Sequence, residues 1–361
     1  MTIIFFNPYA DTQVKGAARR IEFLRDLLNG MEVASRAILK ADYPAVSKGW
    51  AESLAWRGGL RRLAYFLQAR RLCLQDGQVV ISEVIFTPTW HSNMVLTVHD
   101  LKAFEPQATR GGMARKWAYL VFARLARRVV VVSESVRADM IRCCGVRPER
   151  IHVLPNGISQ DRLALARQSL PLAIHYDFVY VSSFARHKRH ALLLRAAPIG
   201  SRICLIGREL GALEEARQAA AERQGEVEVH FRHDVDTDEQ LFELLGASRC
   251  GVFPSIFEGF GIPLLEYAAA GLHVIATDIP PFAELSQYVD RFVPADDEPA
   301  LRSAMQALLT EAPDKNPESA RRVAQGPYTE SAIASKLAEL LRLPRPPSGG
   351  ASAPELTKAR P

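Results

Sequence analysis

The chain has 361 residues, more than the roughly 100–200 residues of one typical domain, which predicts two domains. Hydrophobic residues make up 48% and charged residues 24% of the chain, an ordinary globular composition that excludes wholesale disorder. A formal charge of +5 is too small for a dedicated nucleic-acid-binding protein, but it suits anionic substrates or lipid surfaces.

The start of the chain, MTIIFFNPYADTQ, predicts a first strand rather than a signal peptide, because it lacks a basic region and a long apolar run. No stretch of about 18 consecutive apolar residues predicts a transmembrane helix. The cysteine number is odd and no CxxC pair occurs, which favours reduced thiols in the cytoplasm. The cysteines are Cys73, Cys143, Cys144, Cys204 and Cys250.

Apolar runs of strand length alternate with helical patterns along the chain. Strands are predicted at residues 2–6, 79–82, 95–98, 129–132, 152–154, 178–181, 202–206, 227–231, 251–253 and 274–276. Helices are predicted at residues 17–28, 113–126, 135–143, 190–197, 209–223, 238–246, 263–270 and 329–341. This alternation predicts an α/β protein whose parallel sheets are covered on both faces.

The pattern restarts after the fifth strand. Pro155-Asn156-Gly157 and a polar stretch up to Tyr176 separate the two series, which predicts a hinge between two doubly wound domains. We place the domains at residues 1–155 and 156–326. A helix within residues 327–343 is expected to pack back toward the N-terminal domain. The Pro-, Ser- and Gly-rich residues 344–361 predict a disordered tail.

The segment 257–266, FEGFGIPLLE, combines features of an anion site. It follows a strand and opens a helix, with Pro263 near the first helical position. Gly259 and Gly261 allow the backbone to approach a ligand closely, and a helix N-terminus attracts an anion. Glu258 and Glu266 are placed to hold hydroxyls of two parts of one ligand. The alternative is a tight strand–helix turn with two solvated acids.

Glu258 and Glu266, with seven residues between them, resemble the E-x7-E signature of retaining glycosyltransferases of glycosyltransferase family four. The continuation AGLHVIATD and then Glu284 is similar to the family's G-x-P-V-I-x-S strand and following acid, with His273 where proline is usual. The similarity extends with falling strength over residues 90–300. It implies a GT-B fold, in which two Rossmann-like doubly wound domains face each other across a cleft.

This resemblance also implies roles for the residues of the segment. Glu266 would hold the ribose hydroxyls of the nucleotide, and Glu258 would contact the donor sugar. The backbone N–H groups of the turn before the helix would face the diphosphate or the sugar. The donor-binding residues predicted in this turn are Gly259, Phe260, Gly261 and Ile262.

A second cluster, SSFARHKRH at residues 182–190, lies between a strand and a helix. Departure of a nucleoside diphosphate leaves negative charge on the β-phosphate, which a fixed cation stabilises. The resemblance places Lys188 at the family's diphosphate lysine. Ser183 stands where many members carry an arginine, and Arg186 is the candidate for the second cation. The alternative is a solvated basic helix start.

A third element, LTVHDL at residues 96–101, is similar to the T-x-H-D strand end on the acceptor side of many family members. By this likeness His99 lines the cleft beside the donor sugar, and Asp100 orients the loop or contacts the acceptor. Gly16 stands in the usual place of a Gly-Gly acceptor loop. Ser133 is predicted to cap a helix.

Other cofactor and metal motifs do not occur in the sequence. No GxGxxG follows the first strand, and GxxxxGK[ST] does not occur, which disfavours nicotinamide-linked enzymes and P-loop enzymes. Two His pairs at i,i+3 spacing, His187 with His190 and His230 with His233, are not part of a recognisable metal motif. We therefore expect no cofactor and no required metal, with the nucleotide sugar as co-substrate.

Two stretches, residues 48–71 and 110–128, combine Lys and Arg with aromatic residues, and Glu52 is their only acid. Such a pattern suits helices that lie on anionic lipid, which makes an anionic membrane surface an expected partner, at the cytoplasmic face of the inner membrane. The alternative is core-packing helices with solvated polar faces. Nucleic acid is not an expected partner, because no base-reading module accompanies the charge.

The sequence therefore predicts transfer of a sugar from a nucleotide-diphosphate sugar to a hydroxyl of a glycan or lipid-linked acceptor, with retention at the anomeric carbon. The resemblance favours GDP-mannose as donor and bacterial polysaccharide or lipopolysaccharide assembly as context. The alternatives are a GT-B synthase or phosphorylase that makes a soluble product, and a non-catalytic GT-B-like binding protein.

Overall fold

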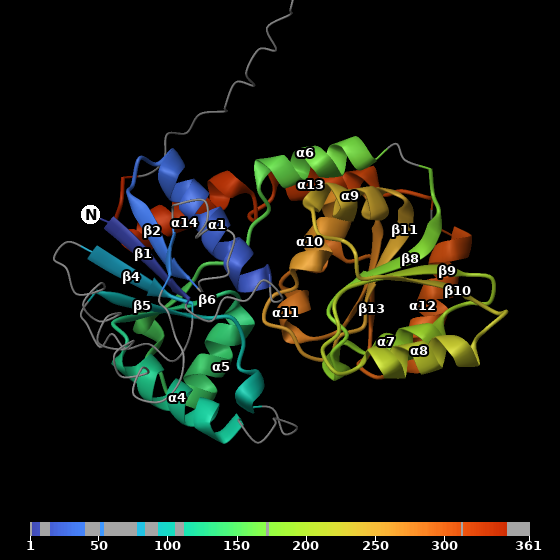
Figure 1. Ribbon diagram of the computed structural model, residues 1–361, viewed down its shortest axis with the longest axis horizontal. Coiled ribbons are helices and arrows are strands. Elements are labelled where there is room, and N and C mark those ends of the chain that lie inside the picture. The colour runs from blue at the N-terminus through green and yellow to red at the C-terminus, as the bar shows by residue number, and fades with distance from the viewer. Residues whose placement is uncertain are drawn as a thin grey trace, which may run out of the picture.

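Two parallel sheets lie side by side in the computed structural model, with helices packed around each (Figure 1). The structure describes residues 2–7, 15–39, 51–53, 78–83, 93–104, 112–170, 173–311 and 313–344. The N-terminal half holds a seven-stranded sheet and the C-terminal half a six-stranded sheet, and all described strand pairs are parallel.

The sheet of the N-terminal half has the order β3-β2-β1-β4-β5-β6-β7. Its strands are β1 (Thr2–Asn7), β2 (Ser35–Leu39), β3 (Ala51–Ser53), β4 (Gln78–Ser82), β5 (Met94–Val98), β6 (Arg128–Val131) and β7 (Ile151–Val153). The helices of this half are α1 (Lys15–Gly30), α4 (Gly112–Leu125) and α5 (Glu134–Cys144), with short 3-10 turns η1 (Lys102–Phe104) and η2 (Pro148–Arg150).

The sheet of the C-terminal half has the order β10-β9-β8-β11-β12-β13. Its strands are β8 (Tyr176–Val181), β9 (Arg202–Ile206), β10 (Glu228–Arg232), β11 (Ser248–Phe253), β12 (His273–Thr277) and β13 (Arg291–Val293). Its helices are α6 (Gln160–Ser169), α7 (His190–Ala196), α8 (Leu213–Glu222), α9 (Asp238–Gly246), α10 (Ile262–Ala269), α11 (Pro280–Ala283), α12 (Glu298–Glu311), α13 (Pro317–Gln325) and α14 (Glu330–Leu341), with 3-10 turns η3 (Arg186–Lys188) and η4 (Ser286–Tyr288).

The ten strands predicted from the sequence are all present, and their ends differ from the prediction by at most three residues. The strands β2, β3 and β13 were not predicted. The polar stretch before Tyr176, predicted to be the hinge between the domains, contains helix α6, which was not predicted. Ser159 caps this helix by accepting a hydrogen bond from the N–H of Arg162, and Leu163 and Ala166 bury its inner face.

Helix α14 returns from the C-terminal half to the N-terminal half, where it packs against α1 (Figure 1). Ile333 and Leu337 of α14 share one buried apolar cluster with Leu24 of α1 and Ile3 of β1. The end of the chain therefore contributes to the core of its beginning. Of residues 344–361, predicted to be a disordered tail, all but Pro344 lie outside the described residues.

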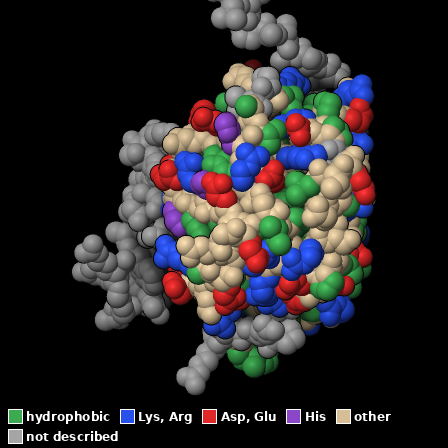
Figure 2. All heavy atoms as spheres, turned by 90° about the vertical axis from the view of Figure 1, so that its right-hand side faces the viewer, with side chains coloured by type: hydrophobic (Ala, Val, Ile, Leu, Met, Phe, Trp, Pro, Cys, Tyr) green, Lys and Arg blue, Asp and Glu red, His purple; other side chains and the backbone are tan. Residues whose placement is uncertain are grey.

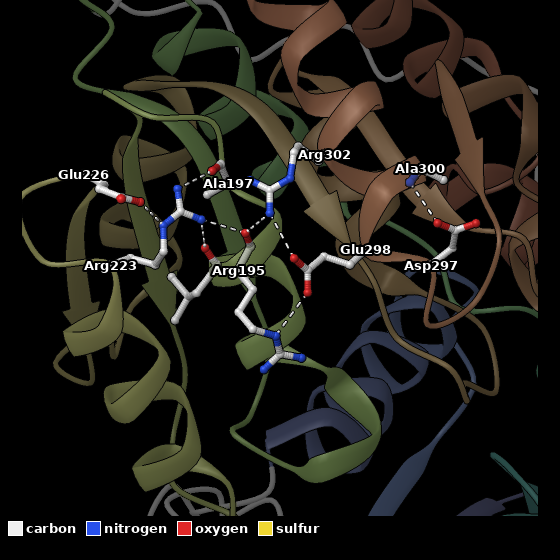
Figure 3. Close-up of polar contacts among 9 residues, drawn as sticks. Arg195, Ala197, Arg223, Glu226, Asp297, Glu298, Ala300 and Arg302 are labelled. Carbon is white, nitrogen blue, oxygen red and sulfur yellow. Dashed lines mark hydrogen bonds and ion pairs between the residues drawn. The ribbon is translucent and has the colours of Figure 1, made fainter.

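Arginine side chains join the helices at the outer edge of the C-terminal half (Figure 3). Arg223 donates to the carbonyl oxygens of Arg195 (2.6 Å) and Ala197 (3.0 Å) at the end of α7. Arg302 of α12 donates to the same Arg195 oxygen and to Glu298. These bonds satisfy carbonyls that a helix end leaves unpaired. Figure 2 shows basic and acidic side chains interspersed on this side of the molecule.

Candidate active site

The carboxyl ends of the strands in both sheets converge where the two halves meet, the usual place of ligands in open α/β sheets. His99 follows β5, and the loop with Gly259 follows β11. A Cβ at Gly259 would lie 1.8 Å from the carbonyl oxygen of His99, so this contact requires glycine. Ser133, which caps α5 as predicted, also donates a 2.7 Å hydrogen bond from Oγ to the Gly259 carbonyl. The two halves therefore touch at the predicted site.

The turn before α10 is built as the sequence suggests. Gly261 is its N-cap with φ +110°, a left-handed conformation that favours glycine, and Pro263 lies in the first turn. Phe260 is buried, with its ring 5.4 Å from that of Tyr328. The buried Phe260 thus anchors the turn, and Ile262 begins the helix behind it.

Lys188 and Glu258 form a salt bridge between η3 and the loop after β11. Both side chains are largely buried, and the ammonium also lies 5.5 Å from the centre of the Phe253 ring. In this structure the positive charge of Lys188 is therefore balanced by the carboxylate that was predicted to contact the sugar. Arg186, the candidate for a second cation, is exposed.

Glu266 is buried on α10 and forms a 2.8 Å salt bridge with Arg162 of α6. Arg162 also lies 2.9 Å from Asp238 of α9 and packs over the Phe242 ring. Burial alone would lower the pKa of Arg162, but the carboxylates of Glu266 and Asp238 outweigh burial and raise it. The sequence did not indicate Arg162, which lies in the polar stretch predicted to be the hinge between the domains.

A pocket of about 650 Å³ lies between α1 of the N-terminal half and α6, α9 and α10 of the C-terminal half. Its lining includes three residues predicted to bind the donor, Ser183, Ile262 and Glu266. Lys188, Glu258 and His99 are not part of this lining. Its size suits a small-molecule ligand. The pocket and the Lys188–Glu258 pair are therefore neighbouring parts of one interdomain region, joined through α10 and its preceding loop.

His99 is held by a buried carboxylate that the sequence analysis missed. Its Nε2 lies 2.7 Å from Glu83 Oε2, and Thr97 donates a 3.0 Å hydrogen bond to the other oxygen of Glu83. Burial would raise the pKa of Glu83, but the bond and charge of His99 and the charge of Arg20 lower it overall. The sequence did contain a signal for Glu83 as a site residue, because this acid directly follows the predicted strand at 79–82.

Arg20 of α1 connects this network to the linker between the halves. Its guanidinium donates to the carbonyl of Leu154 (2.9 Å) and to Asn156 Oδ1 (2.7 Å), and it lies 3.8 Å from Glu83. Burial lowers the pKa of Arg20, partly offset by Glu83. The linker, Glu83 and His99 are thus joined by one buried cation.

Asp100 holds the turn that follows His99. Its Oδ1 accepts a 2.9 Å hydrogen bond from the N–H of Lys102, and its carbonyl accepts one from the Tyr119 hydroxyl. This geometry suits the predicted loop-orienting role. Gly16 lies in the first turn of α1, where the structure describes the backbone only.

Glu284, the acid that follows β12, also bridges the halves. Its carboxylate accepts hydrogen bonds from the N–H groups of Glu134 (2.9 Å) and Ser135 (2.8 Å) at the start of α5. A carboxylate at a helix N-terminus is favourable for the unpaired N–H groups and for the helix dipole. Hydrogen bonds of Ser133 and Glu284 therefore join the two halves at the start of α5.

Within the described ranges, no three His, Cys, Asp or Glu side chains are grouped as metal ligands. Of the two basic stretches, residues 48–71 lie outside the described residues, apart from the strand β3. None of the described helices has the length and apolar character needed to cross a bilayer.

Comparison with known proteins places the chain in a family. A model described as Glycosyltransferase Family 4 matches residues 47–162, and one described as Glycosyl transferases group 1 matches residues 175–311. Together these segments cover more than half of the chain.

The chain is 25% identical over 250 residues to the O-antigen chain mannosyltransferase RfbU of Salmonella typhimurium, covering 68% of this chain and 69% of RfbU. It is also 25% identical over 231 residues to alpha-maltose-1-phosphate synthase of Mycolicibacterium smegmatis, covering 54% of this chain and 59% of the synthase.

The fold is similar to that of Anabaena Alr3699/HepE, solved in complex with UDP and glucose. The TM-score is 0.73 at 16% identity, over 95% of this chain and 99% of the other. The two domain models and the shared architecture agree with the E-x7-E resemblance of the sequence. The chain therefore belongs to the GT-B glycosyltransferases of family four, the group 1 glycosyltransferases.

Proposed function

We propose that the protein transfers a sugar from a nucleotide-diphosphate sugar to a hydroxyl of a glycan or lipid-linked acceptor. The observation that carries this proposal is the arrangement of Glu266 in a pocket, with Lys188 and Glu258 beside the start of the same helix. A nucleoside fits the pocket, with its ribose hydroxyls on Glu266. The diphosphate then lies near Lys188 and the N-terminus of α10, where cations and unpaired N–H groups favour negative charge.

The proposed reaction retains the configuration at the anomeric carbon. The bond between that carbon and the β-phosphate oxygen breaks, and its electron pair stays on the phosphate. The acceptor oxygen forms a bond to the same carbon on the same face, and its proton passes to the departing phosphate. No paired carboxylates are then needed for acid and base chemistry, in contrast to glycoside hydrolysis.

Glu258 and Lys188 exchange partners in this proposal. In the structure they neutralise each other. When the donor binds, the ammonium turns to the β-phosphate and the carboxylate accepts hydrogen bonds from sugar hydroxyls. Each charged group then stabilises a part of the donor instead of its present partner. His99 lines the sugar side, and no metal or further cofactor is required for these steps.

We favour GDP-mannose as the donor and bacterial polysaccharide or lipopolysaccharide assembly as the context, supported by the relative named an O-antigen chain mannosyltransferase. The relative named alpha-maltose-1-phosphate synthase favours a second candidate, a synthase with a soluble product. Thermal stabilisation by GDP-mannose, UDP-glucose and dTDP-glucose ranks the donors, because a ligand of the native state raises the melting temperature. Anomeric proton coupling in the product then tests retention, and an inverted product contradicts the mechanism.

The exposed surface of helix α4 supports the proposal that the acceptor is bound to a membrane. Four apolar side chains follow each other at every fourth position, Met113, Trp117, Val121 and Leu125, and each is between 45% and 65% exposed. They form one outward stripe, while Ala118 and Ala123 are buried on the inner side of the helix. Figure 1 shows α4 at the lower edge of the N-terminal half.

The charges on and after α4 are all basic. Residues 112–128 contain five Lys and Arg and no acid. A stripe of four side chains is small beside the roughly 800 Å² per partner of a stable protein interface. An anionic bilayer matches both features, since Trp and apolar side chains insert at the interface and basic ones attract the headgroups. We propose that α4 rests on the cytoplasmic face of the inner membrane, where it brings the cleft to a lipid-linked acceptor.

A further inference from the structure

The turn after β5 carries a lysine from the N-terminal half to the donor-side residues of the C-terminal half. Lys102 Nζ lies 3.0 Å from His187 Nδ1, and His187 directly precedes Lys188 on η3. The turn is fixed at its base, because Asp100 binds the N–H of Lys102 and His99 packs on Gly259. The ammonium of Lys102 is therefore held across the cleft beside the predicted diphosphate lysine.

The partner of Lys102 does not neutralise it. Burial, together with Lys188 and Lys102, lowers the pKa of His187 to about 3, so its imidazole is neutral at physiological pH. Nδ1 then accepts the hydrogen bond and the ring proton lies on Nε2. Burial lowers the pKa of Lys102, and among the other charged groups that act on it Asp100 and Glu258 oppose this shift while Lys188 and Arg115 add to it.

The donor-side residues Lys188, Glu258 and Ser183 provide too little positive charge for a diphosphate without a further cation. Lys188 is matched by Glu258, so this pair alone presents no net charge to a ligand. Ser183 supplies no charge, and Arg186 is exposed. A nucleoside diphosphate carries more than one negative charge, and departure adds charge on the β-phosphate.

We propose that Lys102 is a second cation for the diphosphate of the donor, supplied across the cleft by the acceptor-side domain. This inference rests on the proposed function. Lys102 leaves His187 Nδ1 for a β-phosphate oxygen when the donor enters, and it stabilises the charge that remains there after the sugar has left. Because the lysine and Lys188 belong to different halves, the phosphate site is complete only when the halves are in contact.

Three variants separate charge from domain contact. Lys102→Met removes the cation and the hydrogen bond, and Lys102→Arg keeps a cation. His187→Leu removes the partner but leaves the lysine charge. Lys336→Met, at an exposed lysine of α14, is the matched control. Rates of nucleoside diphosphate release are measured with GDP-mannose and UDP-glucose, and titration calorimetry compares GDP and UDP with guanosine and uridine.

We expect Lys102→Met to lower kcat roughly ten- to a hundredfold, somewhat below the scale for a fully enclosed electrostatic donor. It should weaken binding of GDP and UDP but not binding of guanosine and uridine. Lys102→Arg should recover part of the lost rate and affinity, and His187→Leu should lose less of both than Lys102→Met. If Lys102→Met and wild type have the same kcat and the same affinity for GDP and UDP, the inference about Lys102 is overturned while the proposed function stands. A loss in His187→Leu as large as in Lys102→Met would also overturn it, because the lysine would then act through domain contact. Wild-type protein that binds neither diphosphate and uses neither donor would overturn the proposed function as well.

Discussion

Arg162 of α6 and Glu266 of α10, more than a hundred positions apart in the sequence, form a 2.8 Å salt bridge inside the pocket. Asp238 holds the other side of the same guanidinium. The bridge keeps one oxygen of Glu266 in a fixed position, because both partners are largely buried. Arg162 thus orients the carboxylate that we propose to bind ribose.

Glu266→Ala should weaken nucleoside diphosphate binding, because it removes hydrogen bonds between a charged carboxylate and the ribose hydroxyls. Such bonds contribute about 1.5–3 kcal/mol, which corresponds to roughly a 10- to 150-fold change in Kd. Titration calorimetry with GDP and UDP measures the effect. Glu311→Ala, at an exposed acid of α12, is the control. Unchanged affinity in Glu266→Ala would show that ribose binds elsewhere.

Glu83→Gln should lower turnover more than donor affinity, because Glu83 positions His99 and lies outside the pocket lining. Gln retains the shape of the side chain but not the charge that faces Arg20. We expect kcat for donor hydrolysis to fall roughly tenfold or more while KM stays within a few-fold, as for loss of an interaction made only in the transition state. A rise in KM with unchanged kcat would contradict a role through His99.

The same variant has a pH signature. The pKa of Glu83 is lowered in the folded protein, so its carboxylate stabilises the fold above the unfolded value of about 4.3, and this contribution is lost as pH falls through the folded pKa. The free energy of unfolding of Glu83→Gln should therefore fall less steeply than that of wild type below about pH 4.5. Urea unfolding at several acidic pH values measures both slopes, and equal slopes would contradict the lowered pKa.

His190 should make the fold sensitive to mild acid. It is buried between Phe184 and Tyr180, and burial followed by the charge of Lys188 lowers its pKa to about 3. Below the unfolded pKa of about 6.5 the unfolded chain binds a proton that the folded chain does not, so stability is full above this pH and falls toward about pH 3. His190→Phe should lose less stability than wild type between about pH 7 and pH 5. Identical losses in wild type and His190→Phe would contradict the prediction.

Helix α4 should bind anionic vesicles. Replacing Met113, Trp117 and Leu125 with serine removes most of the exposed stripe. Replacing Arg115, Lys116 and Arg124 with glutamine instead removes charge at roughly 1 kcal/mol per residue near an anionic surface. Flotation with phosphatidylglycerol vesicles should show loss of binding in both variants, with donor affinity intact. Wild-type protein that stays free of these vesicles at low salt would contradict the membrane proposal, and a concentration-dependent dimer lost in the serine variant would assign the stripe to a second copy.

The sequence predicted the fold well where local patterns decide structure. Buried strands such as β5 and β12 are continuous apolar runs, and the turn at Gly261 and Pro263 carries its own glycine and proline signals. Helix α6 was not predicted, because its composition is polar and only a narrow face of it is buried.

The parts of the site that were missed depend on tertiary contacts. Arg20 and Glu83 meet across α1 and β4, and Lys102 meets His187 only because the halves are in contact. No periodicity of one segment encodes such pairs. Residues with a recognisable local motif, such as Glu258 and Glu266, could be selected from the sequence, but their partners could not.

The most direct test measures release of nucleoside diphosphate from GDP-mannose, UDP-glucose and dTDP-glucose by wild type and by Lys188→Met and Glu258→Gln, with Lys336→Met as the control. The account predicts that wild type and the control turn over at least one donor. Lys188→Met should be slower by about 10²–10³, the scale for loss of one preorganised electrostatic donor, and Glu258→Gln should be slowed through loss of sugar contacts. Equal rates in wild type, Lys188→Met and Glu258→Gln, or no turnover of any donor by wild type, would contradict the assignment of this site to glycosyl transfer.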